Sequence, residues 1–569
     1  MKLLGRINNS SYSIFWILLF WVVLNIFSAY YTGIAHDEAY YWVFSQHLDW
    51  GYLDHPPAVA VLIWLGQLLL DNNLGVRSFN ILLNAGSIYL LWKICKIYGK
   101  DIILFSFLYF GIAAFHVYSF IIVPDAPLLA ASVLYFWFLK KYLAKDSIRN
   151  CLLLAMAIAF MIYSKYHGFL ILIFTIVALP KLLFKRSFWL VALFSTIFFL
   201  PNILWQVNNE IPSLEYHISG RGNLPYRIKD TTNYFLGLLL ITGPLLGFIF
   251  WFIIFKTRVI NRWERVLKVT VFGFVIFFFI ASFRSKIEPN WNSPLLIPLF
   301  ILSYKYLIHH LQLRKIAIVL GAITLVLSLS FRFYASNDEV YNNLSPLIDI
   351  KNEFHFWEDW SQSIAAIADG KPVVFLSSYQ LASKYTNYTR ELSHSYNAVY
   401  YRKNQYDLWE IENKLQGQNV LVVSKYKREN FQTVITPIGG YYYTEIENFR
   451  SYNKIKIELQ NKISTLNAGD TYPLVVRLKN QFLVPVTFTE NPELPVNLVV
   501  SIFQHKKLIL EQEFPLPKLS KPLESNQSIR QQLHLKTPEK PGSYYMYISL
   551  KPGNLDPGIN SKKINFKVN

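Results

Sequence analysis

The first 333 residues carry repeated apolar runs, whereas the rest of the chain alternates short apolar and polar stretches as a soluble protein does. A helix needs about 20 apolar residues to cross a bilayer. By this measure the runs predict about eleven transmembrane helices. The predicted helices are 14–31, 75–97, 102–123, 126–143, two within 151–180, 188–205, 235–255, 269–283, 294–308 and 316–331.

The charged residues give the orientation of these helices. The chain has 55 Lys and Arg against 36 Asp and Glu, a net charge of +19. The basic residues gather in short loops between apolar runs, which is the positive-inside pattern of membrane proteins, so we expect no nucleic-acid partner. The loop 33–57 holds no Lys or Arg. We therefore place this loop outside and the N-terminus in the cytoplasm, and an odd number of spans puts the C-terminal region outside.

Two apolar segments depart from the simple pattern. The run 151–180 is too long for one span and contains Lys165, so we expect two short helices with Lys165 at the turn. The run 58–70 is short, and counting it as a span would invert every later loop. We therefore expect a helix that lies in the outer membrane interface.

Beyond residue 334 the pattern is that of soluble domains. Apolar runs at 372–377 and 419–424 predict buried strands, and helices are expected after the first of them through Tyr385 and over 406–415. We expect an α/β domain over 335–450 and a β-sandwich over 451–569, after a transmembrane domain over 1–334. The sandwich is predicted from alternating stretches between Pro, Gly and Asn turns, such as 472–478, 496–503 and 543–550.

The first outer loop carries the densest polar cluster of the N-terminal half. It reads HDEAYYWVFSQHLDWGYLDHPP and contains Asp37, Glu38, Asp54 and His55. Carboxylates at a bilayer surface are costly to desolvate, so such clusters usually have a function. A base that takes a proton from a hydroxyl is a positioned carboxylate or imidazole. A solvated loop that merely caps a helix is an equally good interpretation of these residues alone.

Further candidates lie in other predicted outer loops. Asp125 sits in VPDAP, where it serves either as an N-cap of the next helix or as a second catalytic acid. Lys165 either snorkels to the surface or binds a phosphate. The loops EYHISGR and RSKIEPNW add His217, Arg221 and Lys286, and each alone is weak evidence. Together, acids for an acceptor and cations for a phosphate fit a transferase that uses an anionic lipid donor.

Several motifs resemble those of glycosyltransferase family 39, which includes dolichyl-phosphate-mannose protein mannosyltransferases and bacterial lipid A aminoarabinose transferases. They are DEAYYWVFSQHLDWGYLDHPP followed by GVRSFN, then PDAP, SKYHG, PNILWQVNNEIPSLEYHISGR and KIEPNW. The resemblance covers about residues 10–310. It implies the GT-C fold, an active site facing outward, a polyprenyl-phosphate-linked sugar donor and inversion at the anomeric carbon.

The resemblance also assigns roles to residues. Asp37 matches the catalytic carboxylate, with Glu38 beside it and Asp125 at the second acidic position. Tyr40 and His55 replace an Arg and a Lys that grip the lipid phosphate in the aminoarabinose transferases, and Lys165, Arg221 or Lys286 could compensate. Asp54 and His217 match metal-binding positions of those relatives, so they are the candidates for a divalent metal, although we expect no required cofactor.

The leading hypothesis is therefore an inverting glycosyltransferase of the bacterial cytoplasmic (inner) membrane. It would move a sugar from a polyprenyl phosphate to an outer acceptor hydroxyl or phosphate, on lipid A, an envelope glycan or a protein. One alternative is a transporter or flippase for a lipid-linked sugar, which usually shows charges near the midplane and broken helices in matched halves. The other is a non-catalytic protein that binds glycans or assembles other components through its C-terminal region.

Overall fold

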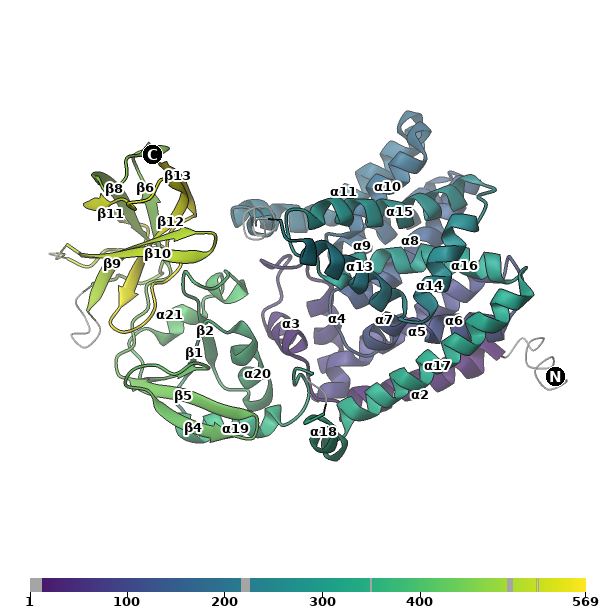
Figure 1. Ribbon diagram of the computed structural model, residues 1–569, viewed down its shortest axis with the longest axis horizontal. Coiled ribbons are helices and arrows are strands. Elements are labelled where there is room, and N and C mark those ends of the chain that lie inside the picture. The colour runs from purple at the N-terminus through teal and green to yellow at the C-terminus, as the bar shows by residue number, and fades with distance from the viewer. Residues whose placement is uncertain (1–12, 216–225, 348–349, 489–494, 518, 520) are drawn as a thin grey trace. The chain divides into compact units, whose positions relative to one another are not determined.

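The computed structural model describes residues 13–215, 226–347, 350–488, 495–517, 519 and 521–569. The chain divides into two compact units, Met1–His355 and Phe356–Asn569. The first unit is helical and the second is rich in strands (Figure 1). The arrangement confirms the predicted fold class, while the division into three domains at 334 and 450 stays a prediction.

The first unit consists of helices joined by short connections. They are α2 Ser13–Tyr31, α3 His36–Gln46, α4 Ala58–Gln67, α5 Asn73–Cys95, α6 Ile102–Phe110, α7 Ala113–Tyr118, α8 Asp125–Ala144, α9 Ile148–Ser164, α10 Gly168–Ala178, η1 Pro180–Phe184, α11 Arg186–Asn208, α12 Pro212–Glu215, α13 Ile228–Thr242, α14 Leu246–Lys256, α15 Arg262–Ser282, η3 Pro289–Leu295, α16 Leu296–Leu307, α17 Leu311–Ser336 and α18 Asp338–Leu344.

Five of these helices, α2, α5, α11, α15 and α17, are long and apolar enough to cross a membrane, and a sixth span results if the pair α13 and α14 is counted as one. This test covers the described residues. Helices α4, α9 and α10 are apolar but shorter. The first unit is thus a membrane domain by length and composition.

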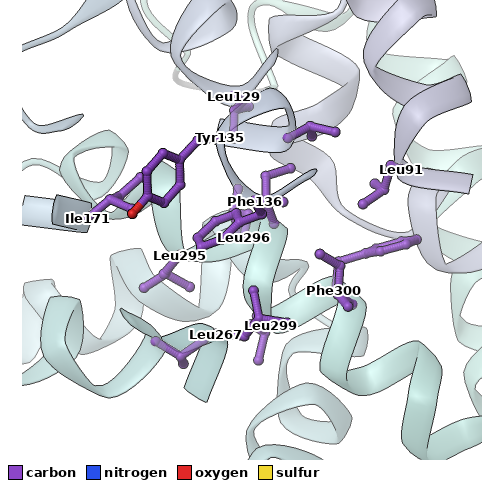
Figure 2. Close-up of a cluster of buried hydrophobic side chains, with 14 of the residues drawn as sticks. Leu91, Leu129, Tyr135, Phe136, Ile171, Leu267, Leu295, Leu296, Leu299 and Phe300 are labelled. Carbon is purple, nitrogen blue, oxygen red and sulfur yellow. The ribbon is translucent and has the colours of Figure 1, made fainter. Parts of the chain in front are cut away.

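The core of this unit surrounds α16, in which residues 296–304 are all buried. Leu296, Leu299 and Phe300 of α16 are each fully buried. They belong to one cluster with Leu91, Phe136 and other side chains from several helices (Figure 2). A helix that is apolar all round is typical of the interior of a membrane bundle.

Two predicted single helices are wrong. The run 102–123 is divided into α6 and α7, and the run 235–255 is divided into α13 and α14, which are bent by 96°. Glycines explain both breaks: Gly243 has a φ of +104°, and a Cβ there would lie 2.5 Å from the carbonyl oxygen of Gly111. The two breaks therefore meet where glycine allows backbones to touch.

Other predicted boundaries agree with the structure. The run 151–180 forms α9 and α10 with Lys165 between them, and 58–70 forms the helix α4. The place of α4 at the membrane surface stays a prediction.

The second unit contains a mixed sheet and two further sheets. The mixed sheet has the order β2-β1-β3-β5-β4, in which β1 to β3 are parallel. The other two have the orders β10-β9-β12-β13-β7 and β11-β8-β6, and they share one core that includes Val476, Ile502 and Met546. The helix predicted over 406–415 is wrong, because η4 and α21 are separated there by turns.

The elements of the second unit have the following bounds: α19 Trp357–Ala368, β1 Val373–Leu376, α20 Tyr379–Thr389, β2 Ser393–Tyr396, η4 Gln405–Asp407, α21 Ile411–Leu415, β3 Val420–Ser424, β4 Gln432–Thr436, β5 Gly439–Ile446, β6 Ile455–Leu459, β7 Thr465–Leu466, β8 Thr471–Asn480, β9 Val496–Gln504, β10 Lys507–Pro515, β11 Ser528–Lys536, β12 Gly542–Pro552 and β13 Ile564–Val568.

Candidate active site

The two adjacent acids Asp37 and Glu38 lie in the first turn of α3 and have opposite environments. Asp37 is exposed, whereas Glu38 is fully buried. Successive helical residues point about 100° apart, so one can face the bundle while the other faces out. The backbone N–H of Ala35 donates to Oε2 of Glu38 at 3.0 Å, which fixes the start of the helix.

Arg77 of α5 holds Glu38 in place. Its Nε donates to Oε1 of Glu38 at 2.9 Å and its Nη2 donates to Oε2 at 2.5 Å. The remaining guanidinium N–H groups donate to backbone carbonyls at the end of α2 and just after it: Ala29 at 3.0 Å, Thr32 at 2.7 Å and Gly33 at 2.8 Å. Arg77 is fully buried. Its hydrogen bonds connect α5 with α3 and with the end of α2.

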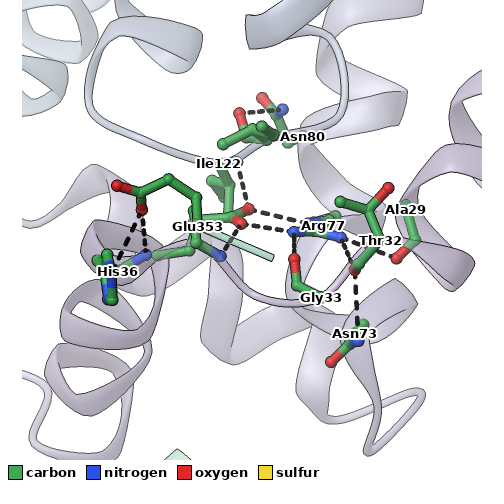
Figure 3. A network of polar contacts seen from close by, with 12 residues as sticks. Ala29, Thr32, Gly33, His36, Asn73, Arg77, Asn80, Ile122 and Glu353 are labelled. Atoms are coloured by element: carbon green, nitrogen blue, oxygen red, sulfur yellow. Dashed lines mark hydrogen bonds and ion pairs between the residues drawn. The ribbon is translucent and has the colours of Figure 1, made fainter. Parts of the chain in front are cut away.

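Two further contacts tie the neighbourhood of α3 together. The backbone N–H of Ile122 donates to Oε1 of Glu38 at 2.8 Å. At the beginning of α3, the backbone N–H of His36 donates to Glu353 at 3.1 Å (Figure 3). The segment before α8 and the end of the first unit thus both contact α3.

Asp125 lies in the first turn of α8 and pairs with Lys165. The Nζ of Lys165 lies 2.8 Å from each carboxylate oxygen of Asp125, and both side chains are about 3% exposed. Ser293 Oγ donates to Asp125 at 2.7 Å and Asn290 Nδ2 donates at 3.0 Å, both from η3. Asp125 is therefore a buried acceptor of four hydrogen bonds.

These contacts decide between the interpretations of two residues. The N-cap of α8 is Pro124, and no side chain caps that helix, so Asp125 does not act as the predicted N-cap. Lys165 follows the last residue of α9, and its ammonium group is buried in the ion pair, so it does not snorkel to the surface.

The two acidic clusters lie at one end of the bundle. Ile122 touches Glu38 and is three residues before Asp125, and three residues of chain span at most about 11 Å. A bilayer core is about 30 Å thick. Asp37, Glu38, Asp125 and Lys165 thus lie much closer to one another than the thickness of a bilayer core.

Tyr40 and Asp54 form a separate polar pair. The hydroxyl of Tyr40 donates to Oδ2 of Asp54 at 2.8 Å, and both residues are buried. His55 is half-buried, and its ring lies 5.6 Å from that of Tyr41. Burial raises the pKa of the neighbouring Tyr52 well above its ordinary value.

The remaining predicted residues are less well placed. Lys286 is exposed and lies 3.3 Å from Glu288, shortly before η3. His217 and Arg221 lie outside the described residues. Within the described ranges no group of three or more His, Cys, Asp or Glu side chains could hold a metal ion, so Asp54 is the one described member of the predicted metal pair.

The site contains residues that the sequence alone did not reveal. Arg77 donates to Glu38, and Asn290 and Ser293 donate to Asp125. Arg77 stands in the motif GVRSFN and Asn290 in KIEPNW, but neither motif indicates which residue its polar side chain contacts.

The fold is that of known GT-C proteins. A crystal structure of ArnT from Cupriavidus metallidurans bound to undecaprenyl phosphate matches with a TM-score of 0.57 and 13% identity, over 76% of this chain and 98% of that chain. The apo structure of the same protein matches with a TM-score of 0.58 and 13% identity, over 76% and 97%. The chain therefore has the fold of a GT-C membrane protein.

The family comparison is consistent with this fold. The family model described as dolichyl-phosphate-mannose-protein mannosyltransferase matches residues 54–205. No curated protein matches the sequence. The resemblance to that glycosyltransferase family is thereby confirmed, and the matched segment contains Asp54, His55, Asp125 and Lys165.

Proposed function

We propose that this protein is an inverting glycosyltransferase that moves a sugar from a polyprenyl-phosphate donor to an acceptor outside the bacterial inner membrane. The match of residues 54–205 to the mannosyltransferase family supports sugar transfer. The ArnT structure, which has the same fold, is bound to undecaprenyl phosphate, and this supports a polyprenyl phosphate as the lipid partner.

One observation carries the assignment of the base. Asp37 is exposed at the first turn of α3, while the neighbouring acids Glu38 and Asp125 are buried and each contacts a cation. A general base must reach the proton that it removes. Asp37 is the acid of this group that an acceptor can reach, and we assign Glu38 and Asp125 as positioning residues.

The proposed reaction is a single displacement. Asp37 takes the proton of the acceptor hydroxyl as the oxygen attacks the anomeric carbon of the sugar. The bond between that carbon and the phosphate oxygen breaks, and its electron pair leaves with the lipid phosphate. Attack from the face opposite the leaving group inverts the configuration. An acceptor phosphate, which is already ionised, would need no base.

The cations of the site would stabilise the departing phosphate. Lys286 is exposed and His55 is half-buried, so both are accessible to a lipid headgroup, and Arg221 stays a candidate from the motif. Lys165 is held by Asp125, and we propose that it acts through the field of the pair rather than as a direct clamp. A preorganised donor that contacts the developing negative charge directly typically contributes about 2.7–4 kcal/mol to transition-state stabilisation.

We route no step through a metal. The oxygen Oδ2 of Asp54 accepts a hydrogen bond from Tyr40, and this donor would have to turn away for a metal to bind that oxygen. A metal held by Asp54 and His217 would supply charge neutralisation at the phosphate.

The test is transfer by the purified full-length protein from synthetic polyprenyl-phosphate sugars to envelope lipids and glycans. Asp37→Asn keeps the shape and removes the base, so we expect transfer to hydroxyl acceptors to fall at least about a hundredfold. Glu339→Gln is the matched control, because Glu339 is an exposed carboxylate in the first turn of α18 that the proposed reaction does not use. Wild-type rates in a folded Asp37→Asn protein would disprove this assignment.

A transporter for lipid-linked sugars is the second candidate. The 96° bend between α13 and α14 is the observation that favours it, since transporters use discontinuous helices. Measured movement of a fluorescent polyprenyl-phosphate sugar across proteoliposomes, without any transferred sugar, would support transport and contradict the transferase.

A further inference from the structure

A mainly apolar groove lies in the helical unit. It is formed by α7, by the bend before α14 and by the second half of α17, and its volume is about 160 Å³. Leu327 and Phe331 line it and are exposed. In a membrane domain such apolar surface meets the lipid chains, so the groove is open to the bilayer.

Arg332 lines the same groove and is buried, with 4% of the residue exposed. Its Nη1 donates to Ser28 Oγ, and its Nη2 donates to Ser119 Oγ and to the carbonyl of His116, each at 2.8 Å. The guanidinium also lies 4.6 Å from the ring centre of Phe120. All these partners are neutral.

Two nitrogen atoms at this place have no hydrogen-bond partner within the part of the chain that the structure describes. They are Nε of Arg332 and Nδ1 of His116, and both residues line the groove. A buried cation with neutral partners alone is unfavourable, and so is a buried donor without an acceptor. An anion at this end of the groove would satisfy both requirements of Arg332, its charge and its Nε–H donor. In the neutral imidazole of His116, Nε2 donates to the carbonyl of Phe110, so Nδ1 is an acceptor and is not a donor for the anion.

We propose that the groove binds an anionic phospholipid of the surrounding bilayer. Its phosphate accepts from Arg332, and part of one acyl chain lies along Leu327 and Phe331. The volume suits this occupant, because an apolar cavity of roughly 150 Å³ holds a molecule of the size of benzene, and a short acyl segment is similar.

The surroundings favour a resident phospholipid over the sugar donor. A donor phosphate has to lie where a base can reach the acceptor, and no described carboxylate contacts Arg332. Nε2 of His116 lies 2.8 Å from the carbonyl of Phe110, so that nitrogen is engaged as a donor. The groove therefore offers phosphate binding without a reaction centre, and the proposal does not depend on the proposed transfer activity.

The experiment counts retained lipids by native mass spectrometry. The full chain is reconstituted into nanodiscs that contain equal amounts of phosphatidylglycerol and phosphatidylcholine with a trace of undecaprenyl phosphate, then released into detergent. We expect one phosphatidylglycerol per protein, retained about tenfold more often than phosphatidylcholine. Arg332→Gln should reduce its retention about tenfold.

A second variant keeps the test valid if Arg332→Gln fails to fold. Ser328→Leu retains the arginine and fills the groove that Ser328 lines, so it should also lose the lipid. Ser330→Leu is the matched control, since Ser330 is an exposed serine of the same helix that does not line the groove.

Three results would overturn the proposal. Unchanged retention in Ser328→Leu would mean that the lipid binds elsewhere. Equal retention of the two phospholipids would show that the net negative charge of the lipid does not determine binding. Retention of undecaprenyl phosphate in place of phosphatidylglycerol, lost in Ser328→Leu, would assign the groove to the polyprenyl chain.

Discussion

Two buried ion pairs of the helical unit, Glu38 with Arg77 and Asp125 with Lys165, are built differently. In the pair of Glu38 and Arg77, the arginine also donates to three backbone carbonyls. In the pair of Asp125 and Lys165, the carboxylate collects two further side chains, Ser293 and Asn290. The first pair is thus enclosed by main chain and the second by side chains.

This difference indicates different roles. A planar guanidinium that satisfies helix-end carbonyls fixes the position of three helices, and few substitutions could reproduce it. An ammonium group is a compact point charge, and a surrounding shell of side chains can tune the acid that it contacts. We therefore expect the Arg77 pair to determine stability and the Lys165 pair to affect the chemistry near Asp37 more.

The largest expected effect comes from Arg77→Met. It leaves Glu38 and three carbonyls buried without their donor, so we expect a loss of about 5 kcal/mol in the free energy of unfolding. Thermal unfolding followed by tryptophan fluorescence in detergent, together with the yield of monodisperse protein, measures this.

Two controls show whether the loss of stability comes from the several N–H donors of the Arg77 guanidinium. Arg77→Lys keeps the charge but cannot reach all five acceptor sites, so it should recover little of the stability. Lys185→Met removes an ion pair with Asp146 that is exposed on both sides and should change little. A stable Arg77→Met protein would contradict the structural role of this pair.

The second prediction concerns Lys165→Met. Asp125 keeps Ser293 and Asn290 as donors, and no backbone carbonyl loses the hydrogen bond of an arginine as in Arg77→Met, so the expected loss of stability is smaller, about 3 kcal/mol. If the pair serves the proposed reaction, transfer should fall by at least about tenfold in protein that is still folded.

The double variant Lys165→Met with Asp125→Asn separates the two roles. It removes both charges, and most of the stability should return. Transfer should stay low, because the field of the pair is absent. Recovery of full transfer together with stability would mean that this pair, too, is purely structural.

The sequence could predict the acids but not their partners. Asp37, Glu38 and Asp125 stand out because they are charges beside apolar runs, and Lys165 because it interrupts one. Their partners are remote in sequence: Arg77 lies 39 positions from Glu38 and Ser293 lies 168 positions from Asp125. Pairing over such distances depends on how the helices pack, which local pattern does not encode.

The broken helices illustrate the same limit. The runs 102–123 and 235–255 are apolar throughout, and length and hydropathy favour one span for each. The breaks occur where Gly111 and Gly243 bring two backbones into contact, and the need for that contact arises only in the assembled bundle.

Another buried acid, Glu412 of α21 in the second unit, extends the comparison. It accepts from the backbone N–H of Asn453 at 3.1 Å, while the nearby Lys454 pairs with Glu410. Burial, the largest effect, raises the pKa of Glu412 to about 7. A buried acid whose neighbouring cation binds elsewhere thus prefers to hold its proton.

The pH dependence follows from this shift. Because the folded-state pKa lies above the ordinary value, the folded state binds more protons between the two values, and stability falls as pH rises. From pH 5 to pH 7 we expect a loss of about 2 kcal/mol in the unfolding of the second unit. Chemical unfolding at both pH values measures it, and the Glu412→Gln variant should lack this contribution. Equal pH dependence in the two proteins would contradict the shift.

The smallest predicted effect tests whether the shell of Asp125 can be reduced one group at a time. Ser293→Ala removes the 2.7 Å hydrogen bond to Asp125 and leaves Lys165 and Asn290 in place, so unfolding should become easier by about 1 kcal/mol. Ser303→Ala is the matched control, because the buried hydroxyl of Ser303 has no hydrogen-bond partner among the described residues and its removal should cost almost nothing. Equal effects of the two substitutions in thermal unfolding would show that Ser293 contributes packing rather than a hydrogen bond. Of the two neutral side chains that donate to Asp125, Asn290 alone would then contribute a stabilising hydrogen bond.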